Sequence, residues 1–246
     1  MNKLAPIGFA FWILKILATT LGETAGDLLS MTLDLGYVRS LLLTGALLAL
    51  LLLLQVRARR YHALLFWAAI IGTTTVGTEI SDMLDRTLAL GYLWGSLLLV
   101  GLLVAVLVVW YRALGTLRVE PLFGRRAEVF FWLAVLCSNS LGTAFGDFLT
   151  DDLALSYMQG ALVCSGVIGA VLLLHYATRI NTVLLFWAAF IFTRPFGATF
   201  GDWLTKPVER GGLDLGTAQA SLVTLAVFLA VLWVARKRTS PRAFSS

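Results

Sequence analysis

Long apolar segments alternate with short polar ones along the chain. Examples are LLLTGALLALLLLLQV from residue 41 and LLLVGLLVAVLVVWY from residue 97. Such segments suit membrane helices, since ~20 mostly apolar residues are needed to cross the ~30 Å hydrocarbon layer of a bilayer. The pattern predicts an all-α, polytopic membrane protein with eight transmembrane helices, near residues 8–29, 38–56, 62–83, 92–111, 127–148, 157–176, 181–203 and 217–235.

Four copies of one residue pattern run through the chain. Each copy has a tryptophan, a glycine ten residues later, a small residue after fourteen and an aspartate after fifteen. A segment of the type LDLGY, LALGY, LALSY or LDLGT follows each aspartate. The tryptophans are Trp12, Trp67, Trp132 and Trp187, the glycines Gly22, Gly77, Gly142 and Gly197, the small residues Gly26, Ser81, Gly146 and Gly201, and the aspartates Asp27, Asp82, Asp147 and Asp202.

The spacing of the copies divides the chain into two halves. Trp12 to Trp132 and Trp67 to Trp187 both span 120 residues, and a longer polar link separates the second copy from the third. The sequence therefore predicts one integral membrane domain of four helical hairpins. The first half is residues 1–120, with hairpins at 8–56 and 62–111, and the second is residues 121–246, with hairpins at 127–176 and 181–235.

Charge distribution predicts the topology of these hairpins. Only 13% of residues are charged and 59% are hydrophobic, and the net charge of +5 lies in short loops, which indicates membrane topology and not nucleic-acid binding. The positive-inside rule then places both termini in the cytoplasm and makes the hairpins parallel. Four cations lie on the outer side: Arg39, Arg86, Lys206 and Arg210. Thirteen lie on the cytoplasmic side: Lys3, Arg57, Arg59, Arg60, Arg112, Arg118, Arg125, Arg126, Arg179, Arg236, Lys237, Arg238 and Arg242.

The first helix of each predicted hairpin is polar and the second is nearly free of charge. Charge-free helices suit contact with lipid, and polar ones suit the inside of a bundle. Small residues four apart allow two helix backbones to approach closely. At 1.5 Å per residue each aspartate lies roughly 22 Å from its tryptophan. If the tryptophans mark the cytoplasmic aromatic belt, four aspartates form a ring in the outer half of the membrane.

Further charged side chains lie in the same helices. Glu23 and Glu79 each share a helix face with the following aspartate, so six carboxylates share the bundle with the two cations Lys15 and Arg194. Each ionised carboxylate at membrane depth costs about 2.5–3.5 kcal/mol and needs a partner, which can be a proton, a hydroxyl group or a bound cation. Polar candidates along a pathway are Thr24, Thr143, Thr199, Asn139, Lys15 and Arg194.

A purely structural interpretation competes with a functional one. Each aspartate can cap a helix end, and the hydroxyl and amide side chains can join helices by hydrogen bonds. Lys15 and Arg194 can simply neutralise the acids. Capping does not require a glutamate one turn deeper, which favours a functional site for the six acids as a set.

The favoured function is transport of a small cation through a carboxylate-lined site, with protons as competing ligands. Oxygen ligands suit divalent ions such as Mn²⁺, Mg²⁺ or Ca²⁺, and the proposed metal ligands are Asp27, Asp82, Asp147 and Asp202, with Glu23 and Glu79 beside them. The expected partners are the lipid bilayer and this cation, with no covalent cofactor; the oligomeric state stays open.

Other function classes remain as alternatives. The chain has no HExxH, GxSxG or P-loop motif, so we expect no enzyme of the hydrolase or nucleotide-dependent type. A membrane-embedded enzyme or binding protein for a lipid-like or small organic molecule is the main alternative. Transport of an organic cation, held by cation–π contacts to tryptophans, is a third.

The fourfold tryptophan, Gly-x-x-x-[Gly/Ser]-Asp and LxLGY pattern resembles a bacterial and archaeal family of membrane proteins. That family is built from a short repeat of unknown function and is often described as uncharacterised membrane-anchored proteins. The resemblance extends from about residue 8 to 236. It implies a prokaryotic membrane location and four repeats, and it implies no particular chemistry.

Overall fold

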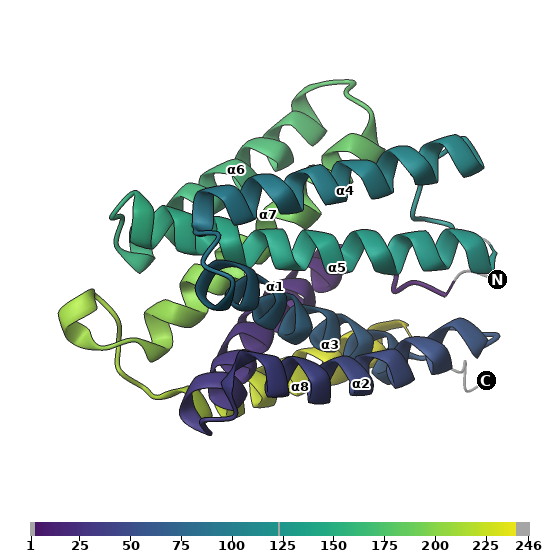
Figure 1. The fold of residues 1–246 in the computed structure, drawn as a ribbon. Helices are drawn as coiled ribbons and strands as arrows, with labels where there is room; N and C mark the ends of the chain where they lie inside the picture. The colour runs from purple at the N-terminus through teal and green to yellow at the C-terminus, as the bar shows by residue number, and fades with distance from the viewer. Residues whose placement is uncertain (1–2, 123, 240–246) are drawn as a thin grey trace.

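The computed structural model describes residues 3–122 and 124–239, and the chain ends and residue 123 lie outside this description, Arg242 of the basic set included. The described residues form no strands. Their eight long helices agree closely with the predicted ranges (Figure 1). The helices are α1 (Phe9–Asp27), α2 (Gly36–Arg57), α3 (Ala63–Asp82), α4 (Tyr92–Leu114), α5 (Arg125–Asp147), α6 (Tyr157–Ala177), α7 (Thr182–Thr205) and α8 (Thr217–Thr239).

Seven of the described helices are long and apolar enough to cross a membrane, which indicates a multi-pass membrane protein. The eighth, α1, does not qualify, although the sequence predicted eight spans. Its 19 residues include Lys15, Glu23 and Asp27, which lower its mean hydropathy. All three charged side chains are buried against other helices of the bundle. The polar residues of α1 therefore face its neighbouring helices.

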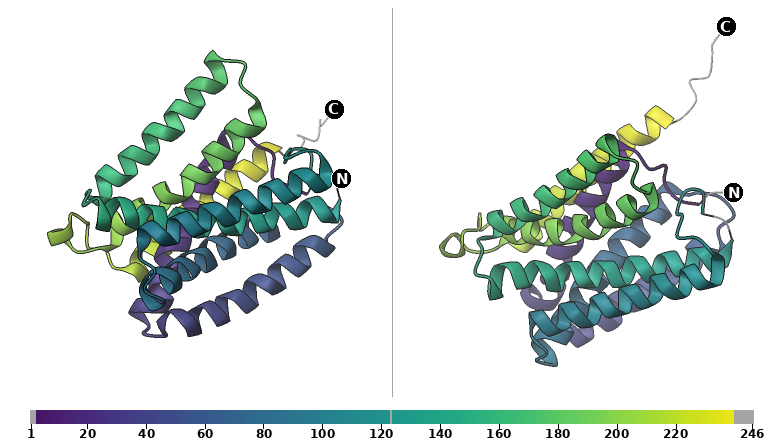
Figure 2. Two further views of the ribbon diagram at one scale, coloured as in Figure 1. Left: turned by 45° about the horizontal axis from the view of Figure 1, so that its top comes forward. Right: turned by 90° about the horizontal axis from the view of Figure 1, so that it is seen from above.

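The four polar helices pack side by side in a closed inner ring. Helix α1 contacts α3, α3 contacts α5, α5 contacts α7, and α7 returns to α1. The apolar helices lie outside, and each packs mainly against the first helix of the following repeat: α2 on α3, α4 on α5, α6 on α7 and α8 on α1. In the left view of Figure 2, α2 and α6 lie along opposite outer edges. The repeats thus interlock instead of standing as separate hairpins.

Aromatic side chains join the inner helices at one end, called here the tryptophan end. In every repeat a phenylalanine directly precedes the tryptophan and packs against the tryptophan of the next repeat. The ring-centroid distances are 5.6 Å for Phe11–Trp67, 5.7 Å for Phe66–Trp132, 6.4 Å for Phe131–Trp187 and 5.7 Å for Phe186–Trp12.

These tryptophans do not form the lipid-facing aromatic belt that the sequence suggested. Trp67, Trp132 and Trp187 are buried between helices, and Trp12 is partly buried. The reason is that the phenylalanine of the preceding repeat, on the adjacent inner helix, packs against each tryptophan. The aromatic contacts therefore close the ring around its full circumference.

Glycines bring the inner helices together nearer the other end. The first glycine of each repeat lies against the next inner helix, with no room for a methyl group. An added Cβ would lie 3.0 Å from the backbone carbon of Thr74 for Gly22, 2.9 Å from the nitrogen of Ser140 for Gly77, 3.0 Å from Cδ of Pro195 for Gly142 and 3.0 Å from the backbone carbon of Thr19 for Gly197. The second small residues also lie at this interface: Gly26 against Thr78, Gly146 against Ala198 and Gly201 against Glu23. The predicted packing role of these glycines is thus supported by their contacts.

Asp27, Asp82 and Asp147 are each the last α-helical residue of their inner helix, whereas Asp202 lies within α7. In the first three repeats a five-residue π-helical turn follows directly: η1 (Leu28–Thr32), η2 (Met83–Thr87) and η3 (Phe148–Asp152). The second residue of every LxL segment then takes a left-handed backbone conformation, with φ of 54° at Asp34, 55° at Ala89, 54° at Ala154 and 52° at Asp214. The repeat is therefore conserved in backbone geometry even where its residues differ.

Substituting Gly22 with alanine tests the ring contact. We expect Gly22→Ala to destabilise the protein by about 1–3 kcal/mol, because the new methyl group meets the Thr74 backbone. Gly45→Ala on α2 is the matched control, since an added Cβ there meets nothing within 4 Å. Thermal unfolding of both variants in detergent measures the difference, and equal unfolding temperatures would contradict the close approach.

Candidate functional site

The four repeat aspartates lie buried at the end of the inner ring opposite the tryptophans, called here the aspartate end. A lysine joins two of them. Nζ of Lys206, just beyond α7, lies 2.6 Å from Oδ2 of Asp27 and 3.2 Å from Oδ1 of Asp202. Burial alone would lower the pKa of Lys206, but the Asp202 and Asp27 carboxylates raise it well above its usual range, so the ammonium stays charged.

An arginine joins the other two aspartates in the same way. Nε of Arg86 lies 3.2 Å from Oδ1 of Asp82, and its Nη2 lies 3.3 Å from Oδ2 of Asp147. Arg86 and Lys206 are 120 residues apart, and each follows its own aspartate by four residues. Each cation thus bridges the aspartate of its own repeat to that of the next repeat around the ring.

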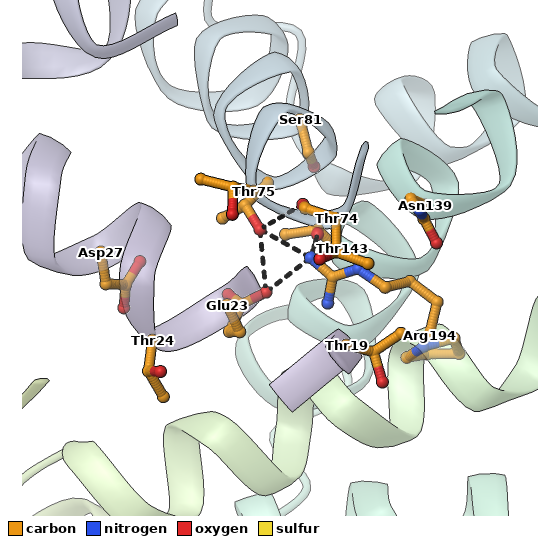
Figure 3. A network of polar contacts seen from close by, with 12 residues as sticks. Thr19, Glu23, Thr24, Asp27, Thr74, Thr75, Ser81, Asn139, Thr143 and Arg194 are labelled. Atoms are coloured by element: carbon orange, nitrogen blue, oxygen red, sulfur yellow. Dashed lines mark hydrogen bonds and ion pairs between the residues drawn. The ribbon is translucent and has the colours of Figure 1, made fainter. Parts of the chain in front are cut away.

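A second charged layer lies one turn deeper, around the guanidinium of Arg194 (Figure 3). Nη2 of Arg194 on α7 lies 2.8 Å from Oε2 of Glu23 on α1 and also donates to Oγ1 of Thr78 and of Thr143, at 2.6 Å each. Glu23, Thr78 and Thr143 occupy the same position in the first three repeats. One arginine therefore connects all four inner helices.

The Arg194 side chain is fully buried but only partly bonded. Its Nε and Nη1 have no acceptor among the described residues, so all of its contacts run through Nη2. Breaking its pair with Glu23 would leave an uncompensated charge in the middle of the ring. The Glu23–Arg194 pair is thus the most deeply buried ion pair among the described residues of the site.

The second buried cation, Lys15, lies closer to the tryptophan end. Its Nζ donates to Oδ1 of Asn139 at 3.1 Å and stands 4.3 Å from the ring centroid of Phe190. Nδ2 of Asn139 in turn donates to Oγ1 of Thr73 at 3.0 Å. Lys15 thus contacts no carboxylate of the cluster, and it links α1, α5 and α7 through polar and aromatic contacts.

Three carboxylates converge at the interface of α1 and α7. One oxygen from each of Glu23, Asp27 and Asp202 lies within 4.8 Å of the others, and all three residues are buried. Asp82 and Asp147 are not part of this group and are held by Arg86. The four predicted metal ligands are therefore not equivalent in the structure. Lys206 bridges Asp27 and Asp202, and Arg86 bridges Asp82 and Asp147.

Other predicted site residues face elsewhere. Glu79 turns outward to α2, where the hydroxyls of Ser40 and Thr44 donate to its two oxygens. Oγ1 of Thr24 accepts from Ser221 on α8 at 2.8 Å, and Thr199 donates to the Pro195 carbonyl of its own helix at 2.9 Å. The hydroxyls of Thr24 and Thr199 thus serve helix contacts, while Thr143 and Asn139 join the buried charged network.

Sequence reasoning missed Arg86 and Lys206 as members of the site. It counted them as external loop cations, although each stands one helical turn after an aspartate, which was the signal available. Asp27 and Asp147 have Met31 and Asp151 at the corresponding place, so only alternate repeats supply a cation. With Lys15 and Arg194 included, the four buried or partly buried cations and the six predicted carboxylates sum to a formal charge of −2, although Lys15 contacts none of these acids and Glu79 lies apart from the cluster.

Fold and site together define a multi-pass helical protein of the membrane type, with buried charges in a fourfold inner ring. The chain belongs to the family described as Repeat of Unknown Function (DUF347), which matches residues 10–61, 65–116, 130–181 and 185–239. Each matched segment begins two residues before one of the four tryptophans, so the family repeat and the fourfold pattern are the same. Comparison with curated proteins and with solved structures finds no match.

Removing the charge of Glu23 tests the central ion pair. We expect Glu23→Gln to destabilise the protein by about 3–5 kcal/mol, because Arg194 stays buried without its carboxylate. The double variant Glu23→Gln/Arg194→Gln should be more stable than Glu23→Gln alone. Thermal unfolding in detergent measures both, with the exposed Asp34→Asn as control. Strictly additive losses in the double variant would show that the two charges are not coupled.

Proposed function

We propose that this protein is a membrane transporter for a small cation, with a divalent metal such as Mn²⁺ as the favoured substrate. The observation that carries the proposal is the convergence of Glu23, Asp27 and Asp202, buried at the α1–α7 interface. Carboxylate oxygens are the ligands that hard divalent ions prefer. Ionisable groups inside membrane helices are costly, and they commonly mark ion or proton pathways.

Lys206 has a defined part in this proposal. Its ammonium contacts Asp27 and Asp202, so it is a tethered cation at the substrate's proposed ligands. An arriving metal ion would replace it, and its side chain is 22% exposed, which gives it room to withdraw towards the aspartate end. Protons compete for the same carboxylates, which would couple transport to a proton gradient.

The proposed arrangement in the membrane extends the helical fold. All eight helices, α1 included, would lie in a prokaryotic inner membrane as four parallel repeats, since α1 is surrounded by α3, α7 and α8. The predominance of Lys and Arg in the loops at the tryptophan end supports a cytoplasmic location for that end and for both termini. The aspartate end, and with it the carboxylate site, would lie nearer the outer face.

Labelling of single cysteines in whole cells tests this orientation. In a background with Cys137→Ala and Cys164→Ala, we expect Asp34→Cys to react with a membrane-impermeant maleimide and Arg60→Cys to react only after the cells are opened. Both positions are exposed in the structure, so accessibility depends on the side of the membrane. The reverse labelling pattern would contradict the proposed topology.

Flux measurements in proteoliposomes test the transport function. We expect Asp27→Asn and Asp202→Asn to lower Mn²⁺ flux by at least about tenfold, because loss of groups that merely support metal ligands already costs 10–100-fold. Asp34→Asn, an exposed acid at the aspartate end, is the control for lost charge. Unchanged flux in both Asp27→Asn and Asp202→Asn would contradict the transport proposal. Metal binding by the unmodified protein without any flux would identify a binding protein instead.

If Lys206 competes with the metal ion for the two aspartates, removing its charge should strengthen metal binding, whereas removing an aspartate should weaken it. We expect Lys206→Met to tighten Mn²⁺ binding, because the metal no longer competes with an ammonium for Asp27 and Asp202. Asp27→Asn should weaken the same binding. Calorimetric titration of the purified protein measures both, with Arg210→Gln as a control at an exposed cation nearby. Weaker binding in Lys206→Met would contradict the competition.

A further inference from the structure

A cavity of about 230 Å³ lies at the tryptophan end, away from the carboxylate cluster. It is formed where α2 ends and α5 begins, with the N-terminal segment beside them. Because α2 belongs to the first half of the chain and α5 to the second, the cavity stands at a junction of the two. The residues lining it are Lys3, Val56, Arg57, Ala58, Arg59, Leu122, Gly124, Arg125 and Glu128.

The one acid of this cavity is already neutralised. Glu128 is buried, and its Oε2 lies 2.6 Å from Nζ of Lys3, while Nε2 of Gln55 donates to its Oε1 at 3.4 Å. Nζ of Lys3 also donates to the carbonyl of Val56 at 3.0 Å. These bonds fix the N-terminal segment to the ends of both helices and hold the wall of the cavity in place.

Three arginines of the lining have no counter-charge. Arg57, Arg59 and Arg125 form no ion pair within the described part of the chain, and all three are exposed. The lining therefore has four cations against one carboxylate. This excess is concentrated around a cavity, which distinguishes it from the basic residues spread over the other loops at this end.

The first turn of α5 adds further donors. Its N-cap is Gly124, which has no side chain to accept from the free backbone amides of that turn. Gly124 and Arg125 both line the cavity, so the partial positive charge of the helix N-terminus adds to the charge of the arginines. Backbone amides together with guanidinium groups are the donors that bind phosphate oxygens in proteins.

We propose that this cavity binds a phosphate group through Arg57, Arg59 and Arg125. Guanidinium groups form paired hydrogen bonds with phosphate oxygens, and a cavity of about 230 Å³ has room for such a group. The phosphate can come from the headgroup of an anionic phospholipid or from a soluble phosphate compound, because both present the same oxygens. Basic pockets between membrane helices bind anionic headgroups in this way.

Binding there would connect the two halves of the chain. A phosphate held by Arg57 at the end of α2, by Arg59 just beyond it and by Arg125 on α5 would join these elements and so stabilise the folded state. None of these residues belongs to the carboxylate cluster at the aspartate end. The site therefore does not depend on the transport function, and its test uses no metal ion.

Thermal unfolding of the purified full-length protein measures this binding. The unfolding temperature is recorded in micelles of a phosphate-free maltoside detergent, in the same micelles with added phosphatidylglycerol, and in the same micelles with inorganic phosphate against chloride at equal ionic strength. We expect an increase with phosphatidylglycerol or with phosphate, and the two arms separate lipid from soluble phosphate. The triple variant Arg57→Gln/Arg59→Gln/Arg125→Gln should bind at least about tenfold more weakly.

A charge-matched control makes the result specific. The variant Arg112→Gln/Arg118→Gln/Arg179→Gln removes the same charge from exposed arginines outside the cavity and should respond as the unmodified protein does. If the triple cavity variant fails to fold, the loop variant Arg59→Gln provides the same comparison. No response of the unmodified protein in either arm, or an equal loss in both triple variants, would overturn the proposal.

Discussion

The close approach of four inner helices is the constraint on which the rest of the structure depends. It occurs because each repeat places a glycine directly against the next inner helix and a phenylalanine against the next tryptophan. Lipid offers little hydrophobic force between helices, so this close packing is what holds the ring together. The contacts run in one direction around the ring and close between α7 and α1.

Closure of the ring explains how charged side chains are tolerated inside. Aspartates at equal positions in four parallel helices would repel one another, but Arg86 and Lys206 each bridge two of them. Glu23 pairs with Arg194 one turn deeper, where Thr78 and Thr143 share the guanidinium. The aspartate thus recurs in all four repeats, the cation that bridges two aspartates follows it only in the second and fourth repeats, and the Glu23–Arg194 pair has no counterpart two repeats away.

Much of the fold could be predicted from the sequence. Apolar length predicted the helices, and the spacing of tryptophan, glycine and aspartate predicted the repeat and a close approach of helices at the glycines. Two things could not be predicted. Spacing within one helix does not tell which helix is the neighbour, so the packing of α2 on α3 was missed. For the same reason the sequence placed Glu79 on one helix face with Asp82 and did not predict its hydrogen bonds with Ser40 and Thr44.

The charges of the site show the same limit. The positive-inside rule assigned Arg86 and Lys206 to the outer loops, because that rule concerns only the side of the membrane. In the structure each forms an ion pair with the aspartate four residues before it. Glu23 was predicted as a site residue because an aspartate that caps a helix does not require a glutamate one turn deeper. Its partner could not be predicted, since Glu23 and Arg194 are 171 residues apart and meet only when the ring closes.

Closure between the first and last repeats is therefore the claim to test most directly. Oγ1 of Thr32 at the end of η1 lies 2.8 Å from Oγ1 of Thr217 at the start of α8. In a background without native cysteines, the pair Thr32→Cys/Thr217→Cys should form a disulfide on mild oxidation, seen by mass spectrometry of peptide fragments. The pair Thr87→Cys/Thr217→Cys, with Thr87 at the corresponding place of the second repeat, should not. Free thiols in the first pair, or equal linkage in both, would contradict a closed ring.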